Sequence, residues 1–204
     1  MRNSTQKVSA GCVILSGGWS SRMGSPKALL PFDGRQNFLQ RLISQYRQAG
    51  IHQIVLVSNH TVDLGYNGDQ DGICVVNNLS PDDGRIHSLR LGLGEVQHAE
   101  FCYIQNIDNP FVDVSLITKL IEHRSQADFV TPVWEGRGGH PVLLSKHVCK
   151  FIVSSNDHSV TLRDLLQPFS RCRVGADNGR CLININEPAD YTRYFPHLIP
   201  QSVD

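Results

Sequence analysis

The chain has 204 residues, with 19 basic and 19 acidic side chains and therefore a formal net charge of zero. This length suffices for one sizeable hydrophobic core but is too short for two comfortable domains, and 40% hydrophobic with 19% charged residues indicates a globular chain. The neutral balance argues against nucleic-acid binding through bulk charge, and the lack of long apolar runs argues against a membrane span.

Six scattered cysteines, none in a Cys-x-x-Cys pair, favour reduced and mostly buried thiols, with a zinc site or a disulfide framework as the minor alternative. Residues 1–9 are polar, and no apolar segment of signal-peptide length follows them. We therefore expect a cytoplasmic protein with a disordered N-terminal tail at 1–9 and a single domain at 10–204.

Strand-like and helix-like segments alternate along the chain. Short apolar runs typical of buried strands occur at 12–15, 54–57, 73–76, 101–107, 129–133 and 182–185. Helices are predicted at 38–46, with Gly50 as a stop signal, and at 87–96, 114–123, 157–166 and 188–194. A turn is predicted at 83–85. The segment 134–144 is glycine-rich and then strand-like, and it is predicted to be a small insertion over the acceptor side of the site.

This alternation predicts an α/β fold with a mostly parallel sheet that is covered on both faces. Ligands of such sheets bind at the carboxyl ends of the strands. The loop after 12–15 and Asp108, which follows 101–107, should therefore lie at the same edge. We expect the Asp108 carboxylate to face solvent there.

The segment 15–27, LSGGWSSRMGSPK, combines glycines with the cations Arg22 and Lys27. Glycine lets backbone N–H groups approach a ligand closely, and the two cations add positive charge, so the segment is suited to binding a polyphosphate. Its spacing fits neither a P-loop, which ends in Gly-Lys-Ser/Thr, nor a G-x-G-x-x-G dinucleotide fingerprint. The alternative is a glycine-rich surface turn with two solvated cations.

This segment resembles the signature of nucleotidyltransferases with a single Rossmann-like domain: L-[AS]-[AG]-G, then S-x-R-M-G, then P-K. PKALLPF at 26–32, GGHP at 138–141 and TLRDLL at 161–166 resemble one branch, the MobA/MocA-like NTP transferase family of molybdenum cofactor cytidylyltransferases and guanylyltransferases. The resemblance covers 11–191 and implies a Rossmann-like three-layer sandwich of the nucleotide-diphospho-sugar transferase type. It also implies transfer of a nucleotide from a nucleoside triphosphate to the phosphate of molybdopterin, with Mg²⁺ or Mn²⁺ as cofactor and pyrophosphate as product.

The resemblance also assigns a nucleotide site. Ser88, in a string that resembles Gly-x-x-x-Ser-Leu, would contact the base and ribose, although a plain helix N-terminus explains the same string. Asn77 and Asn78, just after 73–76, are weaker candidates for base recognition. The nucleotide-binding set is then Leu15, Ser16, Gly17, Gly18, Arg22, Lys27, Asn77 and Ser88, and the catalytic set is Arg22, Lys27 and Asp108.

Asp108 and Asn186 are the candidate Mg²⁺ ligands. Mg²⁺ prefers hard oxygen ligands and often takes only one or two carboxylates besides substrate phosphates. At Asp108 the family usually has Gly-Asp-x-Pro, whereas this chain has Ile107 before the Asp. At 184–188 the family pattern is [DN]-[IV]-[DN]-x-P, and one of its two alternating side chains, Asn184 or Asn186, would be the second ligand; Asn186 is favoured because it lies nearest the carboxyl end of the predicted strand. Each residue also fits a capping role: Asp108 for the following turn or helix, and Asn186 as the N-cap of a helix with Pro188 just inside it.

The string Gly139-His140-Pro141 resembles a Gly-His-Pro signature, which implies binding of the pterin-bearing acceptor; a structural loop with a satisfied histidine is the alternative. A phosphate monoester carries a charge of about −1.5 to −2 near neutral pH, so it needs little help from a general base. The sequence has no convincing Ser/His/Asp or Cys/His arrangement. The chain would instead supply charge neutralisation and in-line positioning, without a covalent intermediate.

Different parts of the sequence favour different nucleotides. The strings at 26–32 and 139–141 favour CTP, whereas Gly17 favours GTP, because the cytidylyl branch usually has Ala there and the guanylyl branch has Gly. The alternatives are a guanylyltransferase, a transferase for a phosphosugar or phospho-alcohol, and a non-catalytic carrier that delivers the finished cofactor to a molybdoenzyme. Lys27, Asp108 and Asn186 together argue against the carrier, which needs no metal centre.

Overall fold

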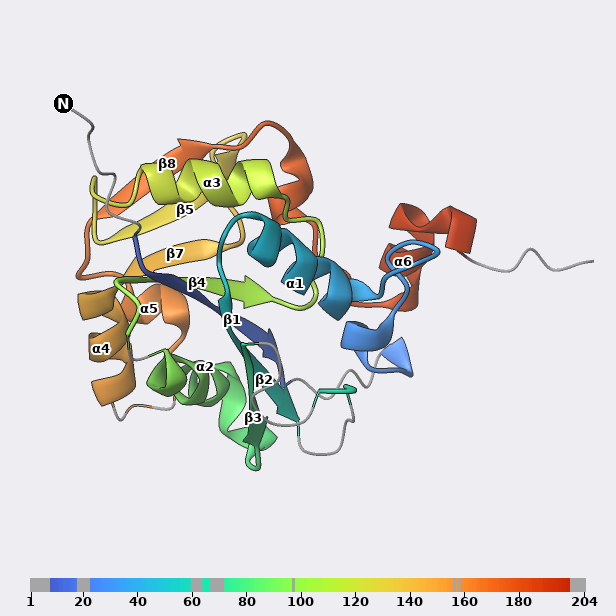
Figure 1. The fold of residues 1–204 in the computed structure, drawn as a ribbon, viewed down its shortest axis with the longest axis horizontal. Helices are drawn as coiled ribbons and strands as arrows, with labels where there is room; N and C mark the ends of the chain where they lie inside the picture. The colour runs from blue at the N-terminus through green and yellow to red at the C-terminus, as the bar shows by residue number, and fades with distance from the viewer. Residues whose placement is uncertain are drawn as a thin grey trace, which may run out of the picture.

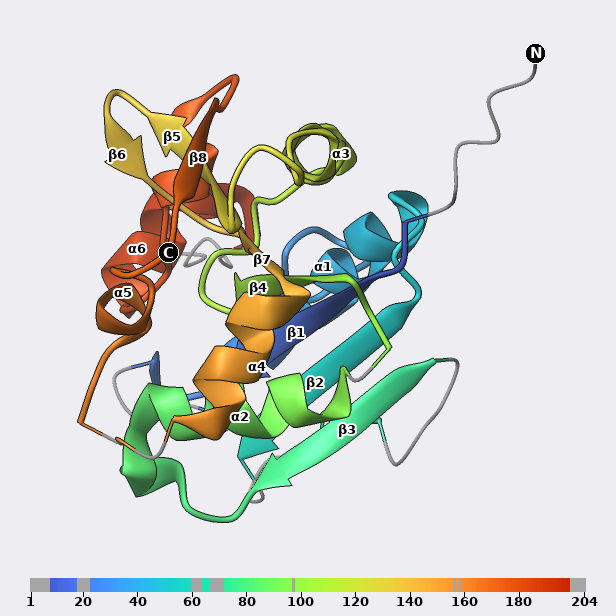
Figure 2. The same cartoon turned by 90° about the vertical axis from the view of Figure 1, so that its left-hand side faces the viewer.

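An eight-stranded sheet forms the centre of the described part of the chain, and helices cover both of its faces (Figures 1 and 2). In this computed structural model, the described residues are 8–17, 23–59, 64–66, 72–96, 98–155, 157 and 159–198. The strand order is β3-β2-β1-β4-β7-β5-β6, with β8 paired to β5. The strands are β1 (Ala10–Ser16), β2 (Gln53–Asn59), β3 (Ile73–Asn78), β4 (Phe101–Asn106), β5 (Phe129–Trp134), β6 (Arg137–Gly138), β7 (Val142–Ser145) and β8 (Arg171–Gly175).

Two groups of parallel strands are joined through one antiparallel strand. β3, β2, β1 and β4 are parallel neighbours, and β8 runs parallel to β5. β7 lies between β4 and β5 and is antiparallel to both, and the short β6 pairs antiparallel to β5. The prediction of an α/β fold with a mostly parallel sheet is confirmed.

The helices pack against alternate residues of the strands. Cys12 and Ile14 of β1 lie in one hydrophobic cluster with α1 (Phe38–Gln48) and α3 (Val114–Glu122). Val13 and Leu15 lie in a second cluster with α2 (Gly84–Glu95) and α4 (Lys146–Ser154). Because successive side chains of a strand point to opposite faces, one apolar run packs against the helices on both faces of the sheet. The three-layer sandwich is therefore confirmed, and Figure 2 shows α2 and α4 together on one face.

The entry into α2 differs from the prediction of a turn at 83–85. A 3₁₀ helix, η3 (Pro81–Asp83), precedes α2, which begins at Gly84. Gly84 has a φ of +83°, a conformation that glycine adopts without steric cost. The chain changes direction there, and Arg85 lies in the first turn of the helix.

The segment 134–144 is not an insertion, because most of it belongs to the sheet. The chain leaves β5 through Glu135 and Gly136, which both have positive φ, and enters β6. β7 then returns to the middle of the sheet, where Val142, Leu143 and Leu144 are buried. A strand covered on both faces needs such a continuous apolar run.

Two predicted elements near the C-terminus are shorter or absent. The helix predicted at 157–166 consists only of α5 (Leu162–Leu165), which Thr161 and Asp164 cap reciprocally. The strand predicted at 182–185 is wrong: a 3₁₀ helix, η4 (Gly179–Leu182), leads into irregular backbone and then into α6 (Pro188–Tyr194), which was predicted. The N–H of Ile185 donates to the carbonyl of Asp108 (2.7 Å) instead of joining a ladder. α4 and β8 were not predicted.

The two ends of the described chain lie outside the sheet. Residues 1–7 of the predicted tail lie outside the described residues, and the carbonyl of Ser9 accepts a hydrogen bond from the N–H of Glu100 (2.8 Å). At the other end, a short 3₁₀ helix, η5 (Pro196–Leu198), follows α6. None of the described helices is long and apolar enough to cross a membrane.

Four parallel strands present their carboxyl ends at one edge of the sheet. In the register, Leu15 of β1 pairs with Asn106 of β4, and Asn59 of β2 pairs with Asn78 of β3. Gly17, Asn78 and Asp108 are therefore brought to the same edge, where this class of sheet binds its ligands.

Candidate functional site

Asp108 is the central acidic group at this edge. It lies two residues after β4, and only 8% of its surface is exposed, so the expectation that it faces solvent is wrong. Its Oδ2 lies 3.9 Å from Nη2 of Arg85, while its buried Oδ1 accepts no hydrogen bond from any described residue. A buried carboxylate oxygen without a partner is costly, so this one favours a bound cation.

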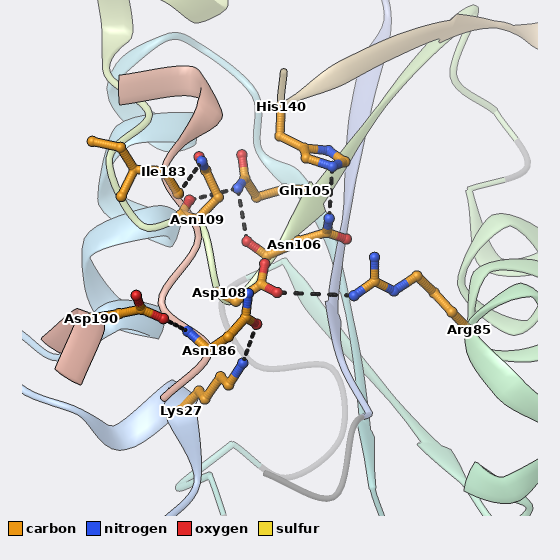
Figure 3. A network of polar contacts seen from close by, with 10 residues as sticks. All are labelled: Lys27, Arg85, Gln105, Asn106, Asp108, Asn109, His140, Ile183, Asn186 and Asp190. Atoms are coloured by element: carbon orange, nitrogen blue, oxygen red, sulfur yellow. Dashed lines mark hydrogen bonds and ion pairs between the residues drawn. The ribbon is translucent and has the colours of Figure 1, made fainter. Parts of the chain in front are cut away.

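Lys27 and Asn186 lie beside Asp108, as Figure 3 shows. Nζ of Lys27, the first residue of the 3₁₀ helix η2 (Lys27–Leu29), donates to Oδ1 of Asn186 (2.9 Å). The N–H of Asn186 donates to Oδ2 of Asp190 (2.8 Å). The N-cap of α6 is Glu187, not Asn186, so capping does not explain Asn186. The structure thus brings the three predicted residues of the metal and phosphate site together.

His140 lies in the loop before β7, the strand that pairs with β4, and contacts Asn106 at the end of β4. Nδ2 of Asn106 lies 2.9 Å from Nε2 of His140, which accepts when Nδ1 carries the proton. Nδ1 is buried and makes no well-aligned hydrogen bond within the described residues, although the backbone of Ile104 lies close enough to raise the pKa of the ring. Burial lowers the pKa of His140, whereas the negative charge of Asp108 raises it and the positive charge of Arg85 lowers it further. The net effect favours the neutral ring at pH 7.

The loop that carries His140 is fixed by close packing on residue 181. A Cβ on Gly139 would lie 2.3 Å from the carbonyl oxygen of Cys181, so only glycine fits. The N–H of Gly139 donates to the carbonyl of Pro132, and that of His140 to the carbonyl of Cys181, both at 2.9 Å. Pro141 follows through a cis peptide bond and is buried.

Asn109 joins the loop after β4 to the chain before Asn186, a role that the sequence analysis did not assign. Its side chain is fully buried, and Nδ2 donates to the carbonyls of Arg180, Cys181 and Ile183. Its own carbonyl accepts from Nε2 of Gln105 (2.8 Å). Asn109 therefore positions both sides of the site. The sequence offered one signal for this role, an asparagine between Asp108 and Pro110. The three carbonyls that its side chain binds, however, lie over 70 residues further along the chain.

Asn109→Ala is expected to lower the free energy of unfolding by about 1–3 kcal/mol, because several buried carbonyls lose a donor. Denaturant unfolding measures this change. The matched control is Asn184→Ala, since Asn184 is exposed in the same segment, and this variant should unfold like the parent protein. Equal stability of the two variants would contradict the positioning role of Asn109.

A third group of residues surrounds Gly17. Nδ2 of Asn78 donates to Oγ of Ser88 (2.9 Å), and a Cβ on Gly17 would lie 3.1 Å from that oxygen. Asn77 is exposed, so the structure brings Asn78, rather than Asn77, into contact with Ser88. The side chain of Leu15 packs in the core, and Gly18 and Arg22 lie outside the described residues.

The sequence model of one family, described as the MobA-like NTP transferase domain, matches residues 12–173. The chain belongs to this family. The molybdenum cofactor cytidylyltransferase of Escherichia coli (strain K12) is 26% identical to it over 188 residues, which are 88% of this chain and 92% of the relative. A probable molybdenum cofactor guanylyltransferase of Bacillus mycoides is 30% identical over 194 residues, 89% of this chain and 93% of the relative. As a member of this family, the chain is a nucleotidyltransferase.

Several solved structures share the fold. Rv0371c from Mycobacterium tuberculosis H37Rv has a TM-score of 0.74 at 24% identity, covering 91% of this chain and 97% of its own. Molybdopterin-guanine dinucleotide biosynthesis protein A from Archaeoglobus fulgidus has a TM-score of 0.67 at 17% identity, covering 90% and 96%.

The donor atoms at this MobA-like site fit a weakly held hard cation. Oδ1 of Asp108 lacks a partner, and Oδ1 of Asn186 lies nearby (Figure 3). Among the described residues, no three His, Cys, Asp or Glu side chains are grouped so as to hold a metal. One carboxylate with amide and phosphate oxygens is a set that Mg²⁺ accepts and zinc does not favour.

The cysteines contribute no reactive group to this arrangement. None of the six described cysteines forms a disulfide, and Cys12, Cys102 and Cys181 are buried. Burial raises the pKa of each of these three thiols. A nucleophilic cysteine needs the opposite shift, toward the thiolate.

Proposed function

We propose that this chain transfers a nucleoside monophosphate from a nucleoside triphosphate, with CTP preferred, to the phosphate of molybdopterin and releases pyrophosphate. The observation that carries the proposal is the unpaired, buried Oδ1 of Asp108 beside the Lys27–Asn186 pair, at the ligand-binding edge of the sheet. The names of the relatives support the acceptor.

In this proposal the chain positions two anions and neutralises their charge. Lys27, held next to Asp108 by its bond to Asn186, contacts the triphosphate near the α-phosphate, together with Arg22. Asp108 and Asn186 would hold Mg²⁺, which lowers the repulsion between the two phosphate groups when it is bound. The acceptor phosphate is already an anion, so no side chain has to remove a proton from it. Preorganised charge supplies the rate enhancement.

The pterin-bearing acceptor is placed on the loop Gly139-His140-Pro141. His140 is neutral at pH 7, because burial lowers its pKa. Its protonated Nδ1 is a buried donor that makes no well-aligned hydrogen bond within the described residues, and an acceptor oxygen of the substrate would give it one. A molybdoenzyme is the proposed recipient of the product.

The decisive experiment is pyrophosphate release with each of the four nucleoside triphosphates, with molybdopterin, a phosphosugar, a phospho-alcohol or no acceptor, and with Mg²⁺, Mn²⁺ or chelator, alongside binding of the finished dinucleotide. We expect release only with molybdopterin and metal, and most rapidly with CTP. A strong preference for GTP would make the chain a guanylyltransferase. Release only with a phosphosugar or phospho-alcohol would reject the acceptor, and tight binding of the finished dinucleotide without turnover would favour a carrier.

Gly17→Ala is expected to raise the preference for CTP over GTP, because a methyl group in a tight pocket shifts selectivity by about 1–3 kcal/mol. The new methyl would lie 3.1 Å from Oγ of Ser88, so Ser88 has to move and the space for a purine shrinks. The ratio of kcat/KM for the two nucleotides, in wild type and variant, measures the effect.

Ser88→Ala provides the matched control for this prediction, because it removes the oxygen that the new methyl approaches. If the methyl acts through Ser88, Gly17→Ala should have a much smaller effect in the Ser88→Ala background. An unchanged CTP/GTP ratio in the single Gly17→Ala variant would mean that residue 17 does not influence base choice.

A further inference from the structure

Arg85 approaches Asp108 from a different side than Lys27, as Figure 3 shows. Its Nη2 lies 3.9 Å from Oδ2 of Asp108, and 65% of its side chain is exposed, against 11% for Asp108. The sequence analysis assigned no role to this arginine, which occupies an unspecified position of the Gly-x-x-x-Ser-Leu pattern.

Neither helix stability nor ion pairing accounts for this placement. Arg85 lies in the first turn of α2, where the helix dipole disfavours a cation. An exposed ion pair at 3.9 Å contributes little to stability. The guanidinium instead brings a positive charge to Asp108, which suits an anionic ligand, whereas Asp82 and Asp83, just before α2, offset the positive end of that helix.

The position of Arg85 points to the acceptor rather than to the nucleotide. Lys27 approaches Asp108 from the Asn186 side, whereas Arg85 comes from α2 and its head group lies away from Lys27 (Figure 3). His140 contacts Asn106, two residues before Asp108, so Arg85 and His140 both meet the segment at the end of β4. A phosphate between Arg85 and His140 would lie next to Asp108.

We propose that Arg85 binds the phosphate monoester of the acceptor and holds it beside Asp108. The planar guanidinium offers two parallel donors to one phosphate, and its charge offsets the repulsion between acceptor and triphosphate. Arg85 thereby completes a cationic pair, with Lys27 on the donor side and Arg85 on the acceptor side. This inference rests on the proposed nucleotidyl transfer.

The test compares Arg85→Met, Arg85→Lys and wild type at saturating Mg²⁺, with KM measured separately for molybdopterin and for CTP. In Arg85→Met the KM for molybdopterin is expected to rise at least tenfold, and the KM for CTP to change less than twofold. Arg85→Lys should recover only part of the loss, because lysine keeps the charge but not the paired donors. Arg163→Met, an exposed arginine on α5, is the matched control and should behave like wild type.

Equilibrium binding of CTP without acceptor, measured by calorimetry, gives a readout independent of turnover and should be the same in wild type and Arg85→Met. An unchanged KM for molybdopterin, or a matching rise in the KM and dissociation constant of CTP, would overturn the assignment of Arg85. A wild-type protein that does not turn over molybdopterin with any of the four nucleotides would instead contradict the proposed function itself. Because the Arg85 side chain is exposed, its replacement should not change the stability of the fold, and thermal unfolding of each variant checks this.

Discussion

Asp108→Asn is expected to reduce turnover by about 10³-fold or more, the scale for losing a metal contact that stabilises developing charge. The free energy of unfolding should stay the same or rise. The carboxylate is almost buried, one of its oxygens has no partner in the described structure, and its ion pair with Arg85 is long. Removing a buried charge whose ion pair spans 3.9 Å relieves a cost of folding.

The measurement combines kcat with a thermal unfolding curve for the same preparation. Asp177→Asn is the matched control, because Asp177 is an exposed carboxylate whose ion pair with Lys119 lies elsewhere. It should leave turnover unchanged. Near-parental, metal-dependent activity in Asp108→Asn would remove Asp108 from the metal site, and a large loss of stability would assign it a structural role instead.

The first half of the fold was predictable because its signals are local. The runs at 12–15 and 54–57 are apolar on both faces, as central parallel strands must be, and the helix between them has clear periodicity and a capping box at Asn37. β8 was missed because it pairs only with β5, and Arg171 and Arg173 on it are exposed. β7 is apolar, but its place between β4 and β5 depends on pairing that a local pattern does not contain.

In the site, too, local sequence signals predicted some features, whereas others depend on contacts between distant segments. Asp108 was placed at the correct edge because the rule for parallel sheets needs only the end of a strand. The contact between Asn106 and His140, and those of Asn109 with Cys181 and Ile183, join segments far apart in the chain. Such contacts follow from packing and not from spacing. The burial of Asp108 is another feature that spacing does not predict. The N–H of Ile185, far along the chain, donates to the carbonyl of Asp108.

Lys27→Ala is expected to reduce turnover by about 10²-fold or more, the scale for one oriented electrostatic contact with a transition state. Lys27→Arg should not restore it, because a planar fork does not replace a compact ammonium held 2.9 Å from Oδ1 of Asn186. Steady-state kinetics at saturating nucleotide measures both variants. Full activity in either one would remove Lys27 from the site.

A double-mutant cycle with Asn186→Ala separates two ways in which Lys27 could act. If Lys27 mainly orients Asn186, the double variant should be no slower than the slower single variant, because the two residues then work as a unit. If Lys27 contacts the phosphates itself, the losses in kcat should largely multiply. We expect the second outcome, since Lys27 begins the short helix η2 directly after the glycine-rich segment and its charge is needed where the triphosphate lies. If the double variant is no slower than the slower single variant, then Asn186, rather than Lys27, contacts the reacting groups.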